Sequence, residues 1–247
     1  MKRAADYAIL VLAMLAAWQV LHWIVGQFAL TSPVETLQFL GGLLQRHSFW
    51  GAAQATLVAL SYATAIAIVG GLAIGLPLGF SRTAGDIADP FLISLFSIPK
   101  ITLYPVILLI FGLGLPAKVA FGAIHGIFPI ALFALSGIRN VKPVYVKTGR
   151  VLGLSAAETI FSVLLPAALP EIVTGIRVGF ATTILGTIIG EMFAGEEGLG
   201  VVLVKAIDHN DVALIMALTL LLFVLSSAAN GVLLALDHRL HRRVTTA

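Results

Sequence analysis

Long apolar runs separated by short polar segments dominate the pattern of the chain. A helix needs about 20 apolar residues to cross the hydrocarbon core of a bilayer, where unpaired backbone groups would find no water. Such runs occupy residues 7–29, 52–80, 91–113, 117–138, 172–193 and 212–236. The pattern therefore predicts an all-α, polytopic membrane protein with about six transmembrane helices, the third of them interrupted by Pro99 and Pro105.

Composition agrees with this pattern, since 59% of the residues are hydrophobic and only 11% are charged. A soluble domain has about a quarter of its residues charged. Lys2 and Arg3 precede the first apolar run, as they would in a secretory signal peptide. That run is longer than the apolar core of a usual signal peptide, so we expect a retained first span.

The basic residues are distributed unevenly between the two sides of the predicted membrane. Lys and Arg that flank a span are retained on the cytoplasmic side. An N-terminus inside the cell places most of them in the cytoplasm, namely Lys2, Arg3, Arg82, Arg139, Lys142, Lys147, Arg150, Arg239, Arg242 and Arg243. Only Arg46, Lys118 and Lys205 then lie outside. We therefore expect both termini in the cytoplasm, and the net charge of +3 needs no nucleic acid as a partner.

Few residues of the chain are arranged as a catalytic or metal site would require. The chain has no cysteine, and its closest histidine pair, His238 and His241, lies in a basic tail where solvated residues are the simpler interpretation. A phosphate-binding loop ending at Lys147 would need glycines at two positions that hold Val141 and Val146. We expect no metal, no bound cofactor and no enzymatic activity in this chain.

One predicted cytoplasmic segment, residues 142–170, is neither apolar enough to span a bilayer nor composed like a linker. Pro143 suits the first turn of a helix that runs to about Leu152. Gly153 can adopt the left-handed conformation that ends it, and Ser155 with Glu158 forms a capping box that starts another. The sequence predicts a helix, glycine, helix unit.

The second loop helix is expected to end at Pro166 and Pro170, before the fifth span. The unit exposes more apolar residues than a solvated loop would. Physical chemistry alone leaves two interpretations open, an amphipathic segment resting on lipid headgroups or a docking site for another protein.

The same loop resembles a known family. Gly153, nine further residues and then Val163-Leu164-Leu165-Pro166 are similar to the G-x9-I-x-L-P core of the cytoplasmic loop in permease subunits of ATP-binding-cassette importers. GEMFAGEEGLG at 190–200 and SIPKITLYPVILLIFGLG at 97–114 look most like the nitrate, taurine, aliphatic sulfonate and bicarbonate branch. The resemblance covers about residues 50–237. One departure is Lys147-Thr148-Gly149, which stands where the family has Glu-Ala-Ala.

The resemblance implies a type I importer fold in which this loop docks on an ATPase subunit. The residues that it assigns to the coupling loop are Lys147, Arg150, Gly153, Leu154, Ser155, Glu158, Leu165 and Pro166. It also implies a bacterial inner membrane, two ATPase subunits that hold ATP and Mg, a second permease copy or paralogue, and an external solute-binding protein. The implied division is an N-terminal span and external loop at 1–49, a transmembrane domain at 50–238 with its coupling loop at 142–170, and a basic cytoplasmic tail at 239–247.

Polar residues inside apolar spans are costly and are therefore candidates for a translocation pathway. They are Lys100, Arg177, Thr182, Thr183, Thr187 and Glu191. Lys100 would attract an anion. The alternatives are that Arg177 and Glu191 extend to the membrane interfaces and that the threonines bond to carbonyls of their own helix. Glycines repeated every four residues, at 71, 75 and 79 and on the fifth span, predict close helix packing within the chain or at a dimer seam.

The predicted function is therefore that of a permease subunit for a small solute, such as a sulfonate, taurine, nitrate or bicarbonate. A secondary active carrier is an alternative that would require repeated halves and coupling residues near the midplane. A membrane enzyme is a further alternative that would require paired catalytic groups. The acidic segment at 196–211 is interpreted either as a contact for the binding protein or as a solvated turn.

Overall fold

A computed structural model describes the backbone of residues 2–245 and the side chains of residues 6–235. The elements follow in the order α1 (Lys2–Val25), α2 (Pro33–Leu43), α3 (His47–Phe80), α4 (Arg82–Ser97), η1 (Lys100–Leu103), α5 (Tyr104–Phe111), α6 (Leu115–Arg139), α7 (Pro143–Val151), α8 (Ala156–Thr159), η2 (Ile160–Leu164), α9 (Leu165–Ala194), α10 (Leu199–Asp208) and α11 (Val212–Thr245). Within the described residues, five helical stretches are long and apolar enough to cross a membrane, and a bent pair makes a sixth. The predicted fold class is confirmed.

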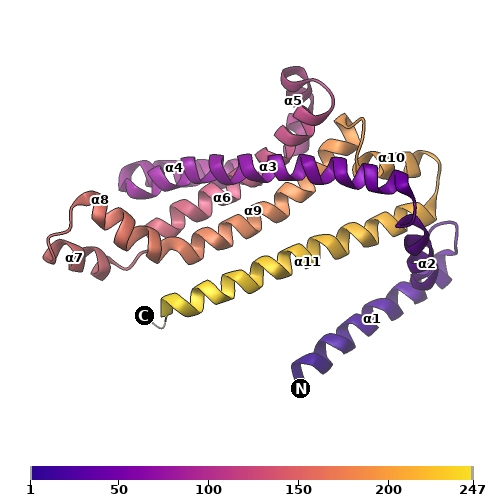
Figure 1. The fold of residues 1–247 in the computed structure, drawn as a ribbon, viewed down its shortest axis with the longest axis horizontal. Helices are drawn as coiled ribbons and strands as arrows, with labels where there is room; N and C mark the ends of the chain where they lie inside the picture. Colours follow the sequence, from indigo (N-terminus) through magenta and orange to yellow (C-terminus); the bar gives the residue numbers. More distant parts are fainter. Residues whose placement is uncertain (1, 246–247) are drawn as a thin grey trace.

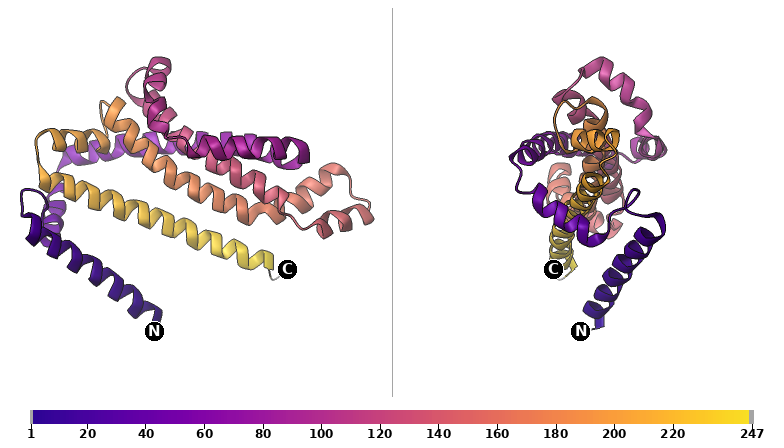
Figure 2. Two further views of the ribbon diagram at one scale, coloured as in Figure 1. Left: turned by 180° about the vertical axis from the view of Figure 1, so that it is seen from behind. Right: turned by 90° about the vertical axis from the view of Figure 1, so that its right-hand side faces the viewer.

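The long helices form an elongated bundle with different elements at its two ends (Figure 1). The short α7 and α8 project beyond one end, whereas α2 and α10 lie at the other. α1 runs from the N-terminus toward the α2 and α10 end, whereas α11 runs from that end back toward the α7 and α8 end (Figure 2). Side chains of the predicted basic tail, including those of His238 and His241, lie outside the described residues, as do those of Lys2 and Arg3.

Helix α6 forms the centre of the bundle, because it packs most extensively on α9 and on α3. Gly71, Gly75 and Gly79 of α3 lie against it, and a Cβ added at Gly71 would come within 2.6 Å of the Cβ of Ile130. Glycines of α9 face α6 in the same way. The repeated glycines therefore bring helices together inside this chain, which is the first of the two alternatives that the sequence left open.

The third apolar run, expected as one span over 91–113, is not a single helix. α4 ends at Ser97, and the segment from Lys100 to Phe111 turns by 86° from it, so that α5 projects from the bundle (Figure 1). Ile98 is extended because a residue before proline avoids the helical region, and Pro99 has no N–H to continue the helix. Lys100 consequently lies at the bend and not along a straight span.

The prediction that Pro166 and Pro170 end the second loop helix is wrong. The chain passes from α8 through the π-helical turn η2 into α9 without leaving the helical conformation. The N–H of Leu165 bonds to the carbonyl of Ile160, five residues back, and Pro166 then occupies the first turn of α9. Pro166 has no N–H to continue the hydrogen bonds of the helix, and the π-helical turn directly before it accommodates this break, while Pro170 lies inside α9.

Candidate functional site

The α7 and α8 loop has the local structure that its sequence predicts. α7 begins at Pro143 and ends in a Schellman motif, where Gly153 has a φ of +75°. The N–H of Gly153 bonds to the carbonyl of Arg150 at 3.1 Å, and that of Leu154 bonds to the carbonyl of Gly149 at 3.0 Å. These bonds satisfy carbonyls at the end of α7 that would otherwise lack partners. The turn between the two loop helices is therefore fixed by backbone geometry.

The start of α8 is fixed by the predicted capping box. The hydroxyl of Ser155 accepts a bond from the N–H of Glu158 at 3.3 Å, and the Glu158 carboxylate accepts one from the N–H of Ser155 at 2.8 Å. Leu154 packs near Gly149, so that the two short helices contact each other. Each of these interactions spans only a few residues, which is why the sequence predicts them.

Large apolar side chains cover the outward part of this loop. The exposed fraction is 87% for Val151 and 72% for Leu152, and it is 69% for Phe161 of η2. The loop lies beyond the end of the bundle (Figure 1). Exposed apolar side chains of this density are a common property of protein contact surfaces. Lys147 and Arg150, in contrast, line a cavity between α7 and the ends of α3 and α6.

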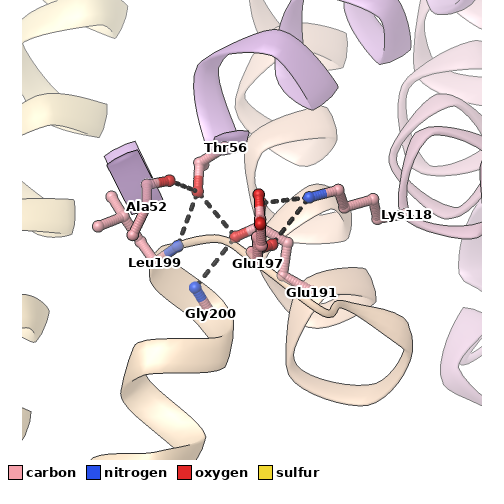
Figure 3. Close-up of polar contacts among 7 residues, drawn as sticks. All are labelled: Ala52, Thr56, Lys118, Glu191, Glu197, Leu199 and Gly200. Carbon is pink, nitrogen blue, oxygen red and sulfur yellow. Dashed lines mark hydrogen bonds and ion pairs between the residues drawn. The ribbon is translucent and has the colours of Figure 1, made fainter. Parts of the chain in front are cut away.

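At the opposite end of the bundle, Glu191 is fully buried at the end of α9 (Figure 3). One carboxylate oxygen lies 3.4 Å from the Nζ of Lys118, at the start of α6. The other oxygen accepts bonds from the hydroxyl of Thr56 of α3 at 2.8 Å and from the N–H of Gly200 at 3.0 Å. A buried charge needs this degree of compensation. We refer to Thr56, Lys118, Glu191 and the backbone of residues 197–200 as the Glu191 cluster.

The cluster joins four segments of the chain. Lys118 also donates to the carbonyl of Glu197 at 2.8 Å, and Thr56 accepts from the N–H of Leu199 at 2.8 Å (Figure 3). Gly198, with a φ of +133°, passes so close to the Glu191 carboxylate that a side chain there would collide with it. The acidic segment 196–211 is consequently not a simple turn, because it contains α10 and is attached to α3, α6 and α9.

Sequence reasoning identified Glu191 but missed Thr56 and Lys118. Lys118 was counted only as an external basic residue, although it begins an apolar span and its charge is opposite to that of Glu191. The opposite charges of Lys118 and Glu191, each near the end of an apolar span, could have predicted an ion pair between them. Nothing in the sequence showed that Thr56 lies beside both.

The three predicted pathway threonines lie in helix contacts. Thr183 and Thr187 are buried, with their hydroxyls against Gly126 and Gly122 of α6. Thr183 donates to the carbonyl of Gly179 in its own helix at 2.8 Å, and Thr182 lies 3.0 Å from the carbonyl of His125. Thr183, and Thr182 with its hydroxyl 2.9 Å from the carbonyl of Gly179, thus match the alternative interpretation, whereas the hydroxyl of Thr187 has no hydrogen-bond partner within the described part of the chain. A role in lining a pathway stays a prediction for these residues.

The two predicted cations of the pathway differ in their surroundings. Lys100 is buried, donates to the carbonyl of Phe96 at 2.8 Å, and lies 5.2 Å and 5.8 Å from the ring centres of Phe96 and Phe128. Carbonyl and aromatic contacts stabilise its charge. Arg177 is half-buried on α9, and its Nε has no hydrogen-bond partner within the described part of the chain. The two cations are therefore not part of one cluster.

A metal centre would need at least three suitable side chains close together. Among residues 6–235, His, Asp and Glu do not form such a group.

Comparison with known proteins gives a family match over most of the chain. Residues 67–246 match the family described as "Binding-protein-dependent transport system inner membrane component". The taurine transport system permease protein of Escherichia coli (strain K12) is 31% identical over 153 residues, which are 62% of this chain and 56% of that protein. The alignment therefore spans just over half of that relative. The nitrate import permease protein of Synechocystis sp. (strain PCC 6803) is 30% identical over 204 residues, 78% of this chain and 73% of that protein.

A solved structure shows the same arrangement of helices. The crystal structure of an amino acid ABC transporter with histidines superimposes with a TM-score of 0.65 at 21% identity. The superposition covers 81% of this chain and 98% of the other. At this identity the likeness concerns the fold, and it agrees with the type I importer fold that the sequence resemblance implied.

Proposed function

Because the chain belongs to the family of binding-protein-dependent transport system inner membrane components, we propose that it forms the translocation pathway for a small anion and is driven by ATPase subunits docked on its α7 and α8 loop. Its relatives are transport permeases and not enzymes. The resemblance to the branch that carries taurine and nitrate is confirmed. A carrier driven by an ion gradient has no support from these relatives.

The observation that carries the docking proposal is the outward apolar surface of the loop. Val151 and Leu152 are largely exposed on a loop that lies beyond the end of the membrane-crossing helices. The Schellman turn and the capping box hold the two helices in a fixed relation, so the surface is ready for a partner. Covering such side chains removes apolar area from water, at about 25 cal/mol for each Å².

The proposed orientation places this loop in the cytoplasm of a bacterium, with the protein in the inner membrane. Two observations and one general rule support it. The α7 and α8 loop, which carries Lys142, Lys147 and Arg150, lies at the end from which α1 starts and toward which α11 runs, so both termini belong on the same side (Figure 1). Arg46 precedes α3, and Lys205 belongs to α10, at the opposite end. An excess of Lys and Arg marks the cytoplasmic side.

The proposed substrate is an anion such as a sulfonate, taurine, nitrate or bicarbonate. Support comes from the names of the relatives and from Lys100, a buried cation at the bend between α4 and α5. An external binding protein would deliver the substrate at the end that carries α2 and α10, and a second permease copy or paralogue would complete the pathway. ATP and Mg would bind in the ATPase subunits.

The docking proposal is tested by Val151→Asp with Val151→Thr as its matched control. A carboxylate buried without a partner in an apolar interface costs several kcal/mol, so we expect recovery of the ATPase with the purified permease to fall at least tenfold. Thr has the shape of Val and no charge, so its variant should retain the partner. Equal recovery with wild type and Val151→Asp would contradict docking at this surface.

The transport proposal is tested in proteoliposomes that contain the permease, its ATPase and its binding protein. Labelled taurine and labelled nitrate should each be tried, with uptake that requires ATP expected for one of them. Uptake that follows an ion gradient and ignores ATP would instead identify a secondary carrier.

A further inference from the structure

The ends of α3 and α6 meet α7 around a cavity of about 360 Å³. Its basic lining residues are Arg82, Arg139, Lys147 and Arg150, and no acidic residue is among the others. We propose that this cavity binds the phosphate group of a membrane phospholipid, a site distinct from the transport pathway and from the outward docking surface.

The charges in this cavity are only partly compensated. Arg139 bonds to the carboxylate of Asp86. Across the described side chains, by contrast, no carboxylate lies within salt-bridge distance of Arg82, Lys147 or Arg150. Three unpaired cations on the walls of one cavity repel one another, and an anion between them removes that repulsion. Asp89 lines an adjoining hollow together with Arg82 and Arg139, so the part of the cavity beside Lys147 and Arg150 favours an anionic ligand most strongly.

Arginine side chains suit a phosphate in particular. A guanidinium donates two parallel bonds to a pair of phosphate oxygens, whereas a lysine ammonium adds a single compact charge. Arg82 lies at the start of α4, and Arg150 reaches the cavity from α7. Together with Lys147, these two arginines supply the N–H donors from which the two charged oxygens of a phosphate diester accept hydrogen bonds.

The position of the cavity favours a lipid as the source of the phosphate. It adjoins the ends of two membrane-crossing helices, and its remaining walls include the apolar side chains of Phe80, Ile138 and Leu164. In the orientation proposed above, on which this step rests, that is the level of the anionic headgroups in the cytoplasmic leaflet. A phospholipid supplies both the charge and the apolar chain that such a site accommodates.

The cavity and the outward apolar surface share no residue. Lys147 and Arg150 line the cavity, whereas Val151, Leu152 and Phe161 of the outward surface do not. The replacement of the family's Glu-Ala-Ala by Lys147-Thr148-Gly149 adds one of these cations. Lys147 at this position is thus explained by lipid binding, without a contact to the ATPase.

The proposal is tested on the full chain, purified in detergent without its partners, by native mass spectrometry. Phosphatidylglycerol should be retained by the wild type more strongly than phosphatidylcholine, because both have a phosphate diester but the cations of the cavity repel the positively charged choline. Arg82→Gln and Arg150→Gln, from α4 and α7, should each weaken retention of phosphatidylglycerol about fivefold, because a basic residue near anionic lipid contributes about 1 kcal/mol. Lys142→Gln is the matched control, since it removes a charge from the same loop but not from the cavity lining.

Several outcomes would overturn the proposal. Equal losses in Lys142→Gln and Arg82→Gln would indicate attraction by net charge, and unchanged retention in both arginine variants would exclude the cavity. Displacement of the lipid by millimolar inorganic phosphate would assign the site to a free anion. Loss of ATPase recovery in Arg82→Gln with normal lipid retention would assign it to the ATPase. Because lipid retention is measured without ATPase or substrate, its failure leaves the transport proposal intact.

Discussion

At one end of the bundle, the buried Glu191 carboxylate receives bonds from Thr56, Lys118 and Gly200, whereas at the other end Arg82 and Arg150 face a cavity without a carboxylate partner among the described side chains. The first arrangement is complete within the chain. The second has exposed cations beside exposed apolar side chains. The difference indicates that one end of the chain holds its own helices together and the other is built to meet other molecules.

The comparison predicts that the two ends respond differently to the loss of one charge. Removing one partner of a buried ion pair leaves the other charge without compensation, while removing an unpaired exposed charge changes little. Loss of one charge from the Glu191 cluster should therefore lower the free energy of unfolding. Loss of one charge from the α7 and α8 loop should affect function and leave stability nearly unchanged.

Lys118→Met should have the largest effect on stability. The Glu191 carboxylate would remain buried without its cation, and such a loss costs about 3–5 kcal/mol. The free energy of unfolding can be measured by denaturant titration of the purified protein in lipid–detergent micelles. Lys205→Met is the matched control at the same end, because Lys205 is exposed and has no ion pair within the described residues, so it should change by less than about 0.5 kcal/mol. Equal losses would contradict a stabilising role for the cluster.

Thr56→Val should have the next largest effect, about 1–3 kcal/mol. Valine keeps the shape of threonine but removes the donor to Glu191 and the acceptor for the N–H of Leu199. The same titration measures it. Ser61→Ala on the same helix removes an exposed hydroxyl that bonds only to the carbonyl of Leu57, and a loss as large there would mean that hydroxyls of α3 matter in general.

Gly153→Val should affect the loop end with a smaller change in stability, about 1–2 kcal/mol, because the left-handed conformation is strained for a residue with a Cβ. A Cβ added at this position meets nothing within 4 Å, so the expected effect comes mainly from the backbone conformation. We expect the variant to be inserted in the membrane but to lose most of the substrate-stimulated activity of the ATPase. Gly153→Asn, which tolerates this conformation better, should retain it; normal stimulation in Gly153→Val would argue against a coupling role.

The loop could be predicted in detail because its structure depends on neighbours in the sequence. The proline at the start of α7, the left-handed glycine and the Ser155 capping box each act over three to five residues. The errors arose where two local signals competed. A proline can end a helix or begin one, and only the π turn before Pro166 decides that the chain continues as α9.

The Glu191 cluster could not be predicted in the same way. Thr56 and Glu191 are 135 residues apart, and their contact depends on the rotation of α3 and α9 about α6. The glycines of α3 and α9 indicated close packing, but several pairings of these helices satisfy the same pattern. A polar residue in an apolar span therefore indicates that a partner exists without identifying it.

The sequence by itself determined that the chain crosses a membrane, which segments do so, and how the α7 and α8 loop is capped, because apolar length and capping are properties of neighbouring residues. The tertiary structure decided which buried charges are paired and which basic residues line one cavity. These outcomes depend on contacts between helices that are distant in the sequence. Such contacts are fixed only when the side chains of α3, α6 and α9 pack together.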